Sequence, residues 1–117
     1  MVTIELDPSG AVLAHFTGGI TRDDQVELRD TIADVIGEQR SARVLVGLQD
    51  IDYSELDADD IWLEVKPAAF LKGTRRLAVL TEPENVEAYK KFTFMAPFPT
   101  KAFPFEQRHD AIEWLLL

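Results

Sequence analysis

Apolar residues are concentrated in five short segments of the chain, each bounded by glycine, proline or charged residues. Such segments are typical of β-strands. The central one, Arg43–Leu48, is almost entirely apolar in its middle, which predicts a strand covered on both faces of a sheet. The turn Asp7-Pro8-Ser9-Gly10 joins the first two segments and predicts a hairpin. The expected strands are Val2–Leu6, Ala11–Thr17, Arg43–Leu48, Arg75–Thr81 and Thr100–Phe103.

Other apolar residues recur at the spacing of an α-helix. One helical face carries Leu28, Ile32, Val35 and Ile36. Thr21 is a suitable N-cap for this helix, because acidic residues follow it in the positively polarised first turn. The helix is predicted to end near Arg40. Three further helices are expected, from Asp57 to a kink or fresh turn at Pro67, over about Glu84–Met95, and over about Gln107–Leu116.

The order of these elements, β-β-α-β-α-β-α-β-α, predicts an α/β fold with a mixed sheet of about five strands packed by about four helices. The connection from the second strand through a helix to the third predicts a right-handed parallel crossover. With 117 residues, of which 46% are hydrophobic, the chain is expected to form a single domain over residues 1–117. A ligand or partner is expected at the carboxyl end of the central strand.

Charge argues against two classes of partner. The net charge of −9 repels phosphate backbones and anionic lipid surfaces, so we expect neither nucleic acid nor a membrane as a partner. Residues 1–65 carry 4 basic and 15 acidic side chains, whereas residues 66–108 carry 8 basic and 4 acidic ones. This asymmetry suits either the orientation of a partner or the solvated faces of separate helices.

The chain contains no cysteine, which excludes disulfides, thiolate nucleophiles and cysteine-based metal sites. The first ten residues lack the pattern of a signal peptide, and no apolar run is long enough to cross a bilayer. We therefore expect a cytoplasmic protein without membrane insertion. His15 and His109 have no metal-ligand spacing around them, so we interpret both as structural or surface residues and predict no metal and no cofactor.

Seven acidic residues and no lysine or arginine lie within residues 44–65. The run beginning at Asp50 starts like a calcium-binding loop, but Glu55 stands where that loop needs glycine and Ile61 where it needs glutamate. A helix cap and a solvated loop explain the carboxylates more simply. The candidate partner-binding residues of this segment are Asp52, Tyr53, Asp57 and Asp59.

Five of the seven phenylalanines lie within residues 92–105. One short helix cannot direct all of the apolar side chains in this stretch into the same core, because their spacing spreads them around its circumference. Two interpretations stay open: some of them face a pocket or a second subunit, or an irregular stretch over residues 96–100 folds back and buries them. The candidate binding residues are Phe92, Phe94, Met95 and Phe98, together with Trp62 and Phe70.

Several segments of the sequence resemble those of the STAS superfamily, and more narrowly those of its SpoIIAA-like branch of small bacterial domains. They are residues 19–24 entering the first helix, the strands at 44–48 and 76–80, and the pair formed by Lys101-Ala102-Phe103 and residues 111–115. The resemblance covers almost the whole chain and implies non-catalytic binding to proteins. It also implies a phosphorylated Ser or Thr where this chain has Asp57, Ala58 and Asp59, so the phospho-switch is not intact. Ser54 lies just upstream among carboxylates that would repel a phosphate, and it is a weak candidate.

These observations predict a non-enzymatic interaction domain that forms a homodimer, with a regulatory protein as a further candidate partner. The alternative is a small carrier that binds an apolar or lipid-like molecule between the second and third helices. An enzyme using Asp50, Asp52 or Glu55 is the least favoured interpretation.

Overall fold

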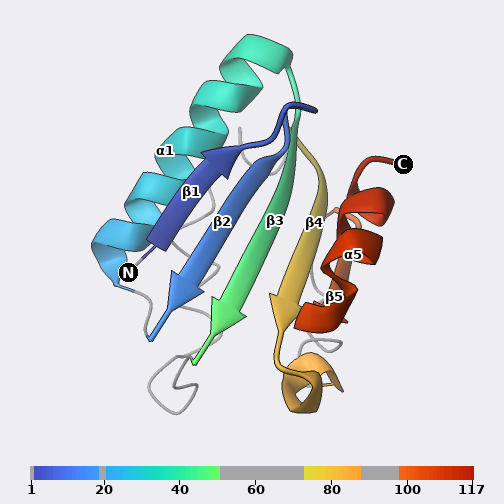
Figure 1. The fold of residues 1–117 in the computed structure, drawn as a ribbon. Helices are drawn as coiled ribbons and strands as arrows, with labels where there is room; N and C mark the ends of the chain where they lie inside the picture. Colours follow the sequence, from blue (N-terminus) through green and yellow to red (C-terminus); the bar gives the residue numbers. More distant parts are fainter. Residues whose placement is uncertain (1, 19–20, 51–72, 88–97) are drawn as a thin grey trace.

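The structure is a computed structural model that describes residues 2–18, 21–50, 73–87 and 98–117. Five strands form one sheet in the order β1-β2-β3-β4-β5 (Figure 1). β1 runs antiparallel to β2, and β2 to β5 are parallel to one another. This arrangement confirms the predicted mixed sheet. The strands are β1 (Val2–Leu6), β2 (Val12–Thr17), β3 (Ala42–Gln49), β4 (Thr74–Thr81) and β5 (Thr100–Pro104).

The hairpin between β1 and β2 forms as the turn residues predict. The Gly10 N–H donates to the Asp7 carbonyl at 2.8 Å, and the Asp7 N–H donates to the carbonyl of Ala11 at 2.9 Å. Gly10 has φ +91°, a backbone conformation that glycine adopts without steric cost.

Helix α1 (Arg22–Gln39) connects β2 to β3. Its first turn is closed by a capping box: the Thr21 hydroxyl accepts from the Asp24 N–H at 3.1 Å, and the Asp24 carboxylate accepts from the Thr21 N–H at 3.4 Å. The helix stops at Arg40, which has φ +69° and donates its N–H to the Ile36 carbonyl at 2.8 Å. The predicted start and end of this helix are therefore both confirmed.

Two hydrophobic cores lie on opposite faces of the sheet. The larger core lies between α1 and the sheet. In the view of Figure 1, α1 lies behind the sheet. The strand residues of this core come from alternate positions, since successive side chains of a strand point to opposite faces. Its buried members are Val12, Ala14, Phe16, Ile32, Val35, Ala42, Val44, Leu48, Leu77, Val79 and Phe98.

The second core lies under helix α5 (Arg108–Leu115), which follows the 3-10 turn η2 (Phe105–Gln107). Ala111 and Leu115 of α5 are fully buried against the sheet. The Arg76 guanidinium lies 5.0 Å from the centre of the Trp114 ring and donates to the Trp114 carbonyl at 2.8 Å, which fastens the helix to β4. The helix packs on β3, β4 and β5, and in Figure 1 it stands in front of the sheet.

Of the four predicted helices, the described residues contain the first and the last. The predicted third helix begins with the 3-10 turn η1 (Pro83–Asn85), and its further course lies outside the described residues. The predicted second helix lies within residues 51–72, which are also outside them. No helix of the described part of the chain is long and apolar enough to cross a membrane.

Candidate functional site

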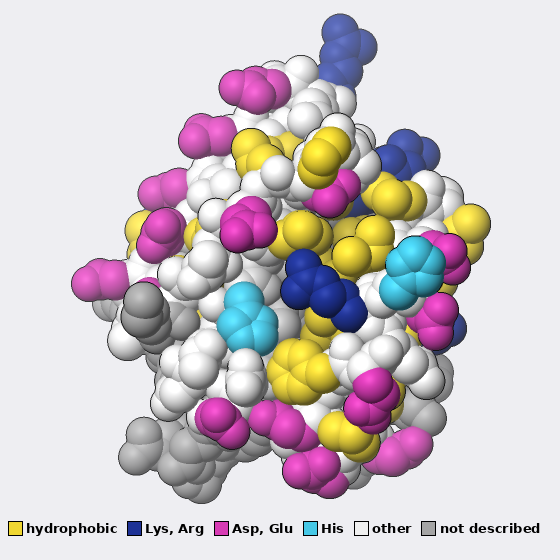
Figure 2. Space-filling model, viewed as in Figure 1, with side chains coloured by type: hydrophobic (Ala, Val, Ile, Leu, Met, Phe, Trp, Pro, Cys, Tyr) yellow, Lys and Arg dark blue, Asp and Glu magenta, His cyan; other side chains and the backbone are white. Residues whose placement is uncertain are grey.

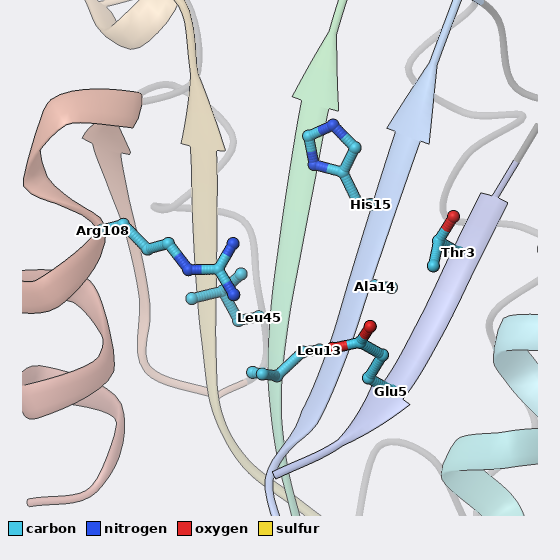
Figure 3. A pocket seen from close by; sticks show the side chains of 7 residues that line it. All are labelled: Thr3, Glu5, Leu13, Ala14, His15, Leu45 and Arg108. Atoms are coloured by element: carbon cyan, nitrogen blue, oxygen red, sulfur yellow. The ribbon is translucent and has the colours of Figure 1, made fainter.

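A groove of about 260 Å³ lies on the α5 side of the sheet, between that helix and β1 (Figure 3). Val2 and Ile4 of β1 and the even-numbered residues of β2 point into the core under α1, so the odd-numbered residues of both strands face the α5 side of the sheet. We call this part of the sheet surface, formed by Thr3, Glu5, Leu13 and His15, the open half-face. The groove is lined by the open half-face together with Ala14, Leu45 and Arg108.

His15 is held in place by three neighbours. Its Nε2 lies 3.0 Å from Oε1 of Gln49, which is the distance of a hydrogen bond between the imidazole and the amide. Its ring is tilted against Phe105, with 6.1 Å between the ring centres. Gly47 lies opposite His15 on β3, and an added Cβ there would stand 2.6 Å from His15 Nδ1. The imidazole therefore occupies space that only glycine leaves free.

Arg108 and Glu5 give the groove opposite charges on its two sides. Arg108 is the first residue of α5, and its side chain extends over the sheet toward Leu45 (Figure 3). Glu5 projects from β1, the strand at the sheet edge. Both side chains are exposed, and neither forms a hydrogen bond or ion pair with another described residue. Among the described residues, neither charge is therefore neutralised by a neighbour.

Half-buried apolar side chains surround these charges. Leu13, Phe105 and Ile112 pack against the core under α5 but keep part of their surface in solvent, whereas Leu45 is 2% exposed and forms the floor. Figure 2, viewed onto the same face, shows hydrophobic side chains around a basic side chain near the centre, with histidine side chains to either side of it. An apolar floor with a few polar groups is a typical composition for a binding surface.

Glu82 lies at the carboxyl edge of the sheet, where the sequence predicts a ligand or partner, and it hydrogen-bonds to residues around the ends of two strands. Its carboxylate accepts from the Asp50 N–H at 2.9 Å, the Thr81 hydroxyl at 3.2 Å and the Asn85 amide at 3.3 Å. Burial alone would raise the pKa of Glu82, but these hydrogen bonds outweigh it and hold the pKa below the ordinary value of 4.5. Glu82 thus ties the end of β3 to the end of β4.

Most of the predicted binding residues lie outside the described residues. This applies to Asp52, Tyr53, Ser54, Asp57, Asp59, Trp62, Phe70, Phe92, Phe94 and Met95. Phe98 is described: it is 6% exposed and belongs to the core under α1. Phe103 is also buried and Phe105 is half-buried, so three of the five phenylalanines of residues 92–105 contribute to the cores.

The two histidines differ in how far they are buried and in what they contact. His109 is exposed and lies 3.1 Å from the carboxylate of Glu113. His15 is half-buried and bonded to Gln49. Within the described ranges, no group of three His, Asp or Glu side chains is placed to hold a metal ion.

Sequence reasoning missed Glu5, Gly47 and Arg108. Glu5 had a usable signal, because a charged residue between Ile4 and Leu6 predicts an outward-facing position on a half-buried strand. Arg108 had none, since its place over the sheet depends on how α5 packs. Gly47 was recognised only as part of the predicted strand Arg43–Leu48, and its role in leaving room for His15 was not.

Comparisons with known proteins agree on the fold. A family model described as SpoIIAA-like matches residues 12–116. A crystal structure of an uncharacterized protein from Shewanella loihica, described as having a SpoIIAA-like fold, superposes with a TM-score of 0.68 at 17% sequence identity. The superposition covers 98% of this chain and 92% of that one. No curated protein matches the chain.

Proposed function

The chain belongs to the SpoIIAA-like family, and we propose that it is a non-enzymatic interaction domain that forms a homodimer. The observation that supports this most directly is the groove over the open half-face. It offers half-exposed apolar surface together with two charges, on Glu5 and Arg108, that have no partner among the described residues. Apolar surface bordered by polar and charged residues is typical of protein interaction sites.

The geometry around His15 favours binding over catalysis. Its Nε2 is hydrogen-bonded to Gln49, and its Nδ1 lies against Gly47. No carboxylate of the described residues is bonded to the ring, so the arrangement of a nucleophile, a base and an orienting acid is not formed there. At the predicted helix start, Asp57 and Asp59 stand where the family resemblance implies a phosphorylated Ser or Thr, so the proposed interaction domain has no intact phospho-switch.

Native mass spectrometry and light scattering test the proposal directly. The expected result is a species of twice 13.2 kDa whose fraction rises with protein concentration and which carries no extra mass. A monomer at every concentration contradicts the homodimer. A monomer that carries a small molecule, released when the protein is denatured, instead supports the carrier of an apolar ligand, for which Trp62, Phe70, Phe92 and Met95 are the candidate contacts.

A further inference from the structure

The α5 side of the molecule has the shape of a step. Helix α5 packs on β3, β4 and β5 and stands in front of the sheet in Figure 1. Within the described part of the chain, no helix lies over β1 and β2 on this side, so the open half-face is lower than the helix beside it. Consider a two-fold axis that runs above the sheet, parallel to the edge between α5 and the open half-face. Rotation about this axis places a second copy face to face with the first. The helix of each copy then lies over the open half-face of the other, so the surface is complementary in shape to itself.

The charges of the groove are complementary in the same sense. Arg108 lies on the high side of the step and Glu5 on the low side, and both line the same groove (Figure 3). The two-fold rotation exchanges the sides and brings Arg108 of each copy toward the low side of the other. Two equivalent pairs of opposite charge then form across the axis. Complementary charge pairs at an interface favour one partner over others and fix its orientation.

We infer that two copies of this chain associate through the open half-face, with Arg108 of each copy paired to Glu5 of the other. This inference rests on the proposed homodimer and names its surface. The apolar part of the contact comes from Leu13, Phe105 and Ile112, whose half-buried surfaces lie beside the groove. Each helix α5 supplies the ridge that covers the partner's groove.

A charge-reversal cycle tests the inference. Arg108→Glu alone and Glu5→Arg alone each replace two attractive pairs by two repulsive ones, because the symmetry duplicates every change. Each single variant is expected to raise the dimer dissociation constant by about ten-fold or more. The double variant restores two attractive pairs and is expected to return to within about three-fold of the original constant. Analytical ultracentrifugation measures all four proteins.

Matched controls separate this effect from a change in net charge. Arg29→Glu and Glu38→Arg make the same charge changes on α1, on the opposite face of the sheet. They are expected to leave the dissociation constant within about two-fold of the original value. All four reversed residues have solvent access, and circular dichroism spectra verify that each variant is folded.

The absence of cysteine from the chain permits a second, independent measurement. Glu5→Cys and Arg108→Cys are prepared separately, mixed and oxidised. A disulfide-linked heterodimer that forms much faster in the mixture than either homodimer does alone supports the inference.

The outcomes distinguish this inference from the proposed function. A wild-type dimer that is unaffected by either charge reversal and is not cross-linked overturns the inference and leaves the homodimer standing on another surface. A wild-type protein that stays monomeric overturns both. Restoration by the double variant, together with the cross-link, establishes the surface and the pairing.

Discussion

Replacing Glu82 by glutamine removes the charge that ties together the carboxyl ends of β3 and β4. The wild-type carboxylate accepts three hydrogen bonds, one at Oε1 from Asp50 and two at Oε2 from Thr81 and Asn85. Glutamine keeps only one accepting oxygen and directs an NH₂ group at donors on the other side. Hydrogen bonds to a charged acceptor contribute roughly 1 kcal/mol more than neutral ones. Because Glu82 is half-buried, we expect the variant to lose about 1–2 kcal/mol of unfolding free energy at neutral pH.

The same contribution has a defined dependence on pH. The pKa of Glu82 is lowered in the folded protein, so the folded state holds the proton less tightly than the unfolded state does. The stabilisation is complete above the ordinary pKa of 4.5 and is lost as the pH falls through the lower pKa of the folded state. The difference in unfolding free energy between wild type and Glu82→Gln should therefore be constant near neutral pH and shrink below about pH 4.5.

Urea denaturation followed by tryptophan fluorescence, at neutral pH and in steps down to about pH 3, measures both effects. Glu84→Gln is the matched control, because Glu84 is exposed in the adjoining turn η1 and accepts none of these hydrogen bonds. Its unfolding free energy should stay within about 0.5 kcal/mol of wild type. The reasoning is refuted if the two glutamine variants are equally stable at neutral pH, or if the deficit of Glu82→Gln persists unchanged at low pH.

Three further substitutions test the packing and the helix cap. Leu115→Ala should cost about 2–5 kcal/mol in urea denaturation, because this fully buried side chain fills the core under α5; a cost below about 1 kcal/mol would contradict that packing. Thr21→Ala should cost about 1 kcal/mol by removing the capping box of α1, and an unchanged unfolding free energy would show that the cap is dispensable. Gly47→Ala should displace His15 and break its bond to Gln49, seen as shifted imidazole resonances in NMR spectra; unshifted resonances would exclude the close approach.

The strands and the first helix were predictable because their signals are local. A hairpin needs a turn that a few adjacent residues specify, and Asp7 and Gly10 supply it. A helix start needs a cap and an acidic first turn, which Thr21 and Asp24 form. The parallel orientation of β2 and β3 follows from the helix between them. Adjacent parallel strands need a long crossover connection, which is usually a helix, whereas adjacent antiparallel strands need only a short turn.

The contacts that build the groove are not local, and their sequence signals are correspondingly weak. Arg76 and Trp114 are far apart in the chain, and their contact fixes where α5 lies on the sheet. The position of Arg108 follows from that docking rather than from its neighbours in sequence. His15 depends in the same way on Gly47 and Gln49, which lie on the adjacent strand. A histidine on a strand becomes interpretable only when the opposite residue is known to leave it room.

The open half-face follows from the relative widths of a helix and a sheet. A helix with its side chains is about 10 Å wide, and neighbouring strands are about 4.8 Å apart, so one helix covers roughly two strand spacings. The five strands of this sheet span four such spacings. On the α5 side, the helix is fixed over β4 by Arg76 and Trp114, and therefore among the described elements β1 and β2 lie beyond its reach. The sequences of β1 and β2 fit this exposure to solvent. Polar side chains on the α5 side alternate with the apolar side chains that face α1, and the residues on the α5 side are Thr3, Glu5, Leu13 and His15. Leu13 is the exception, and its apolar side chain is explained by its position, because it packs against the core under α5 that Leu45 also joins.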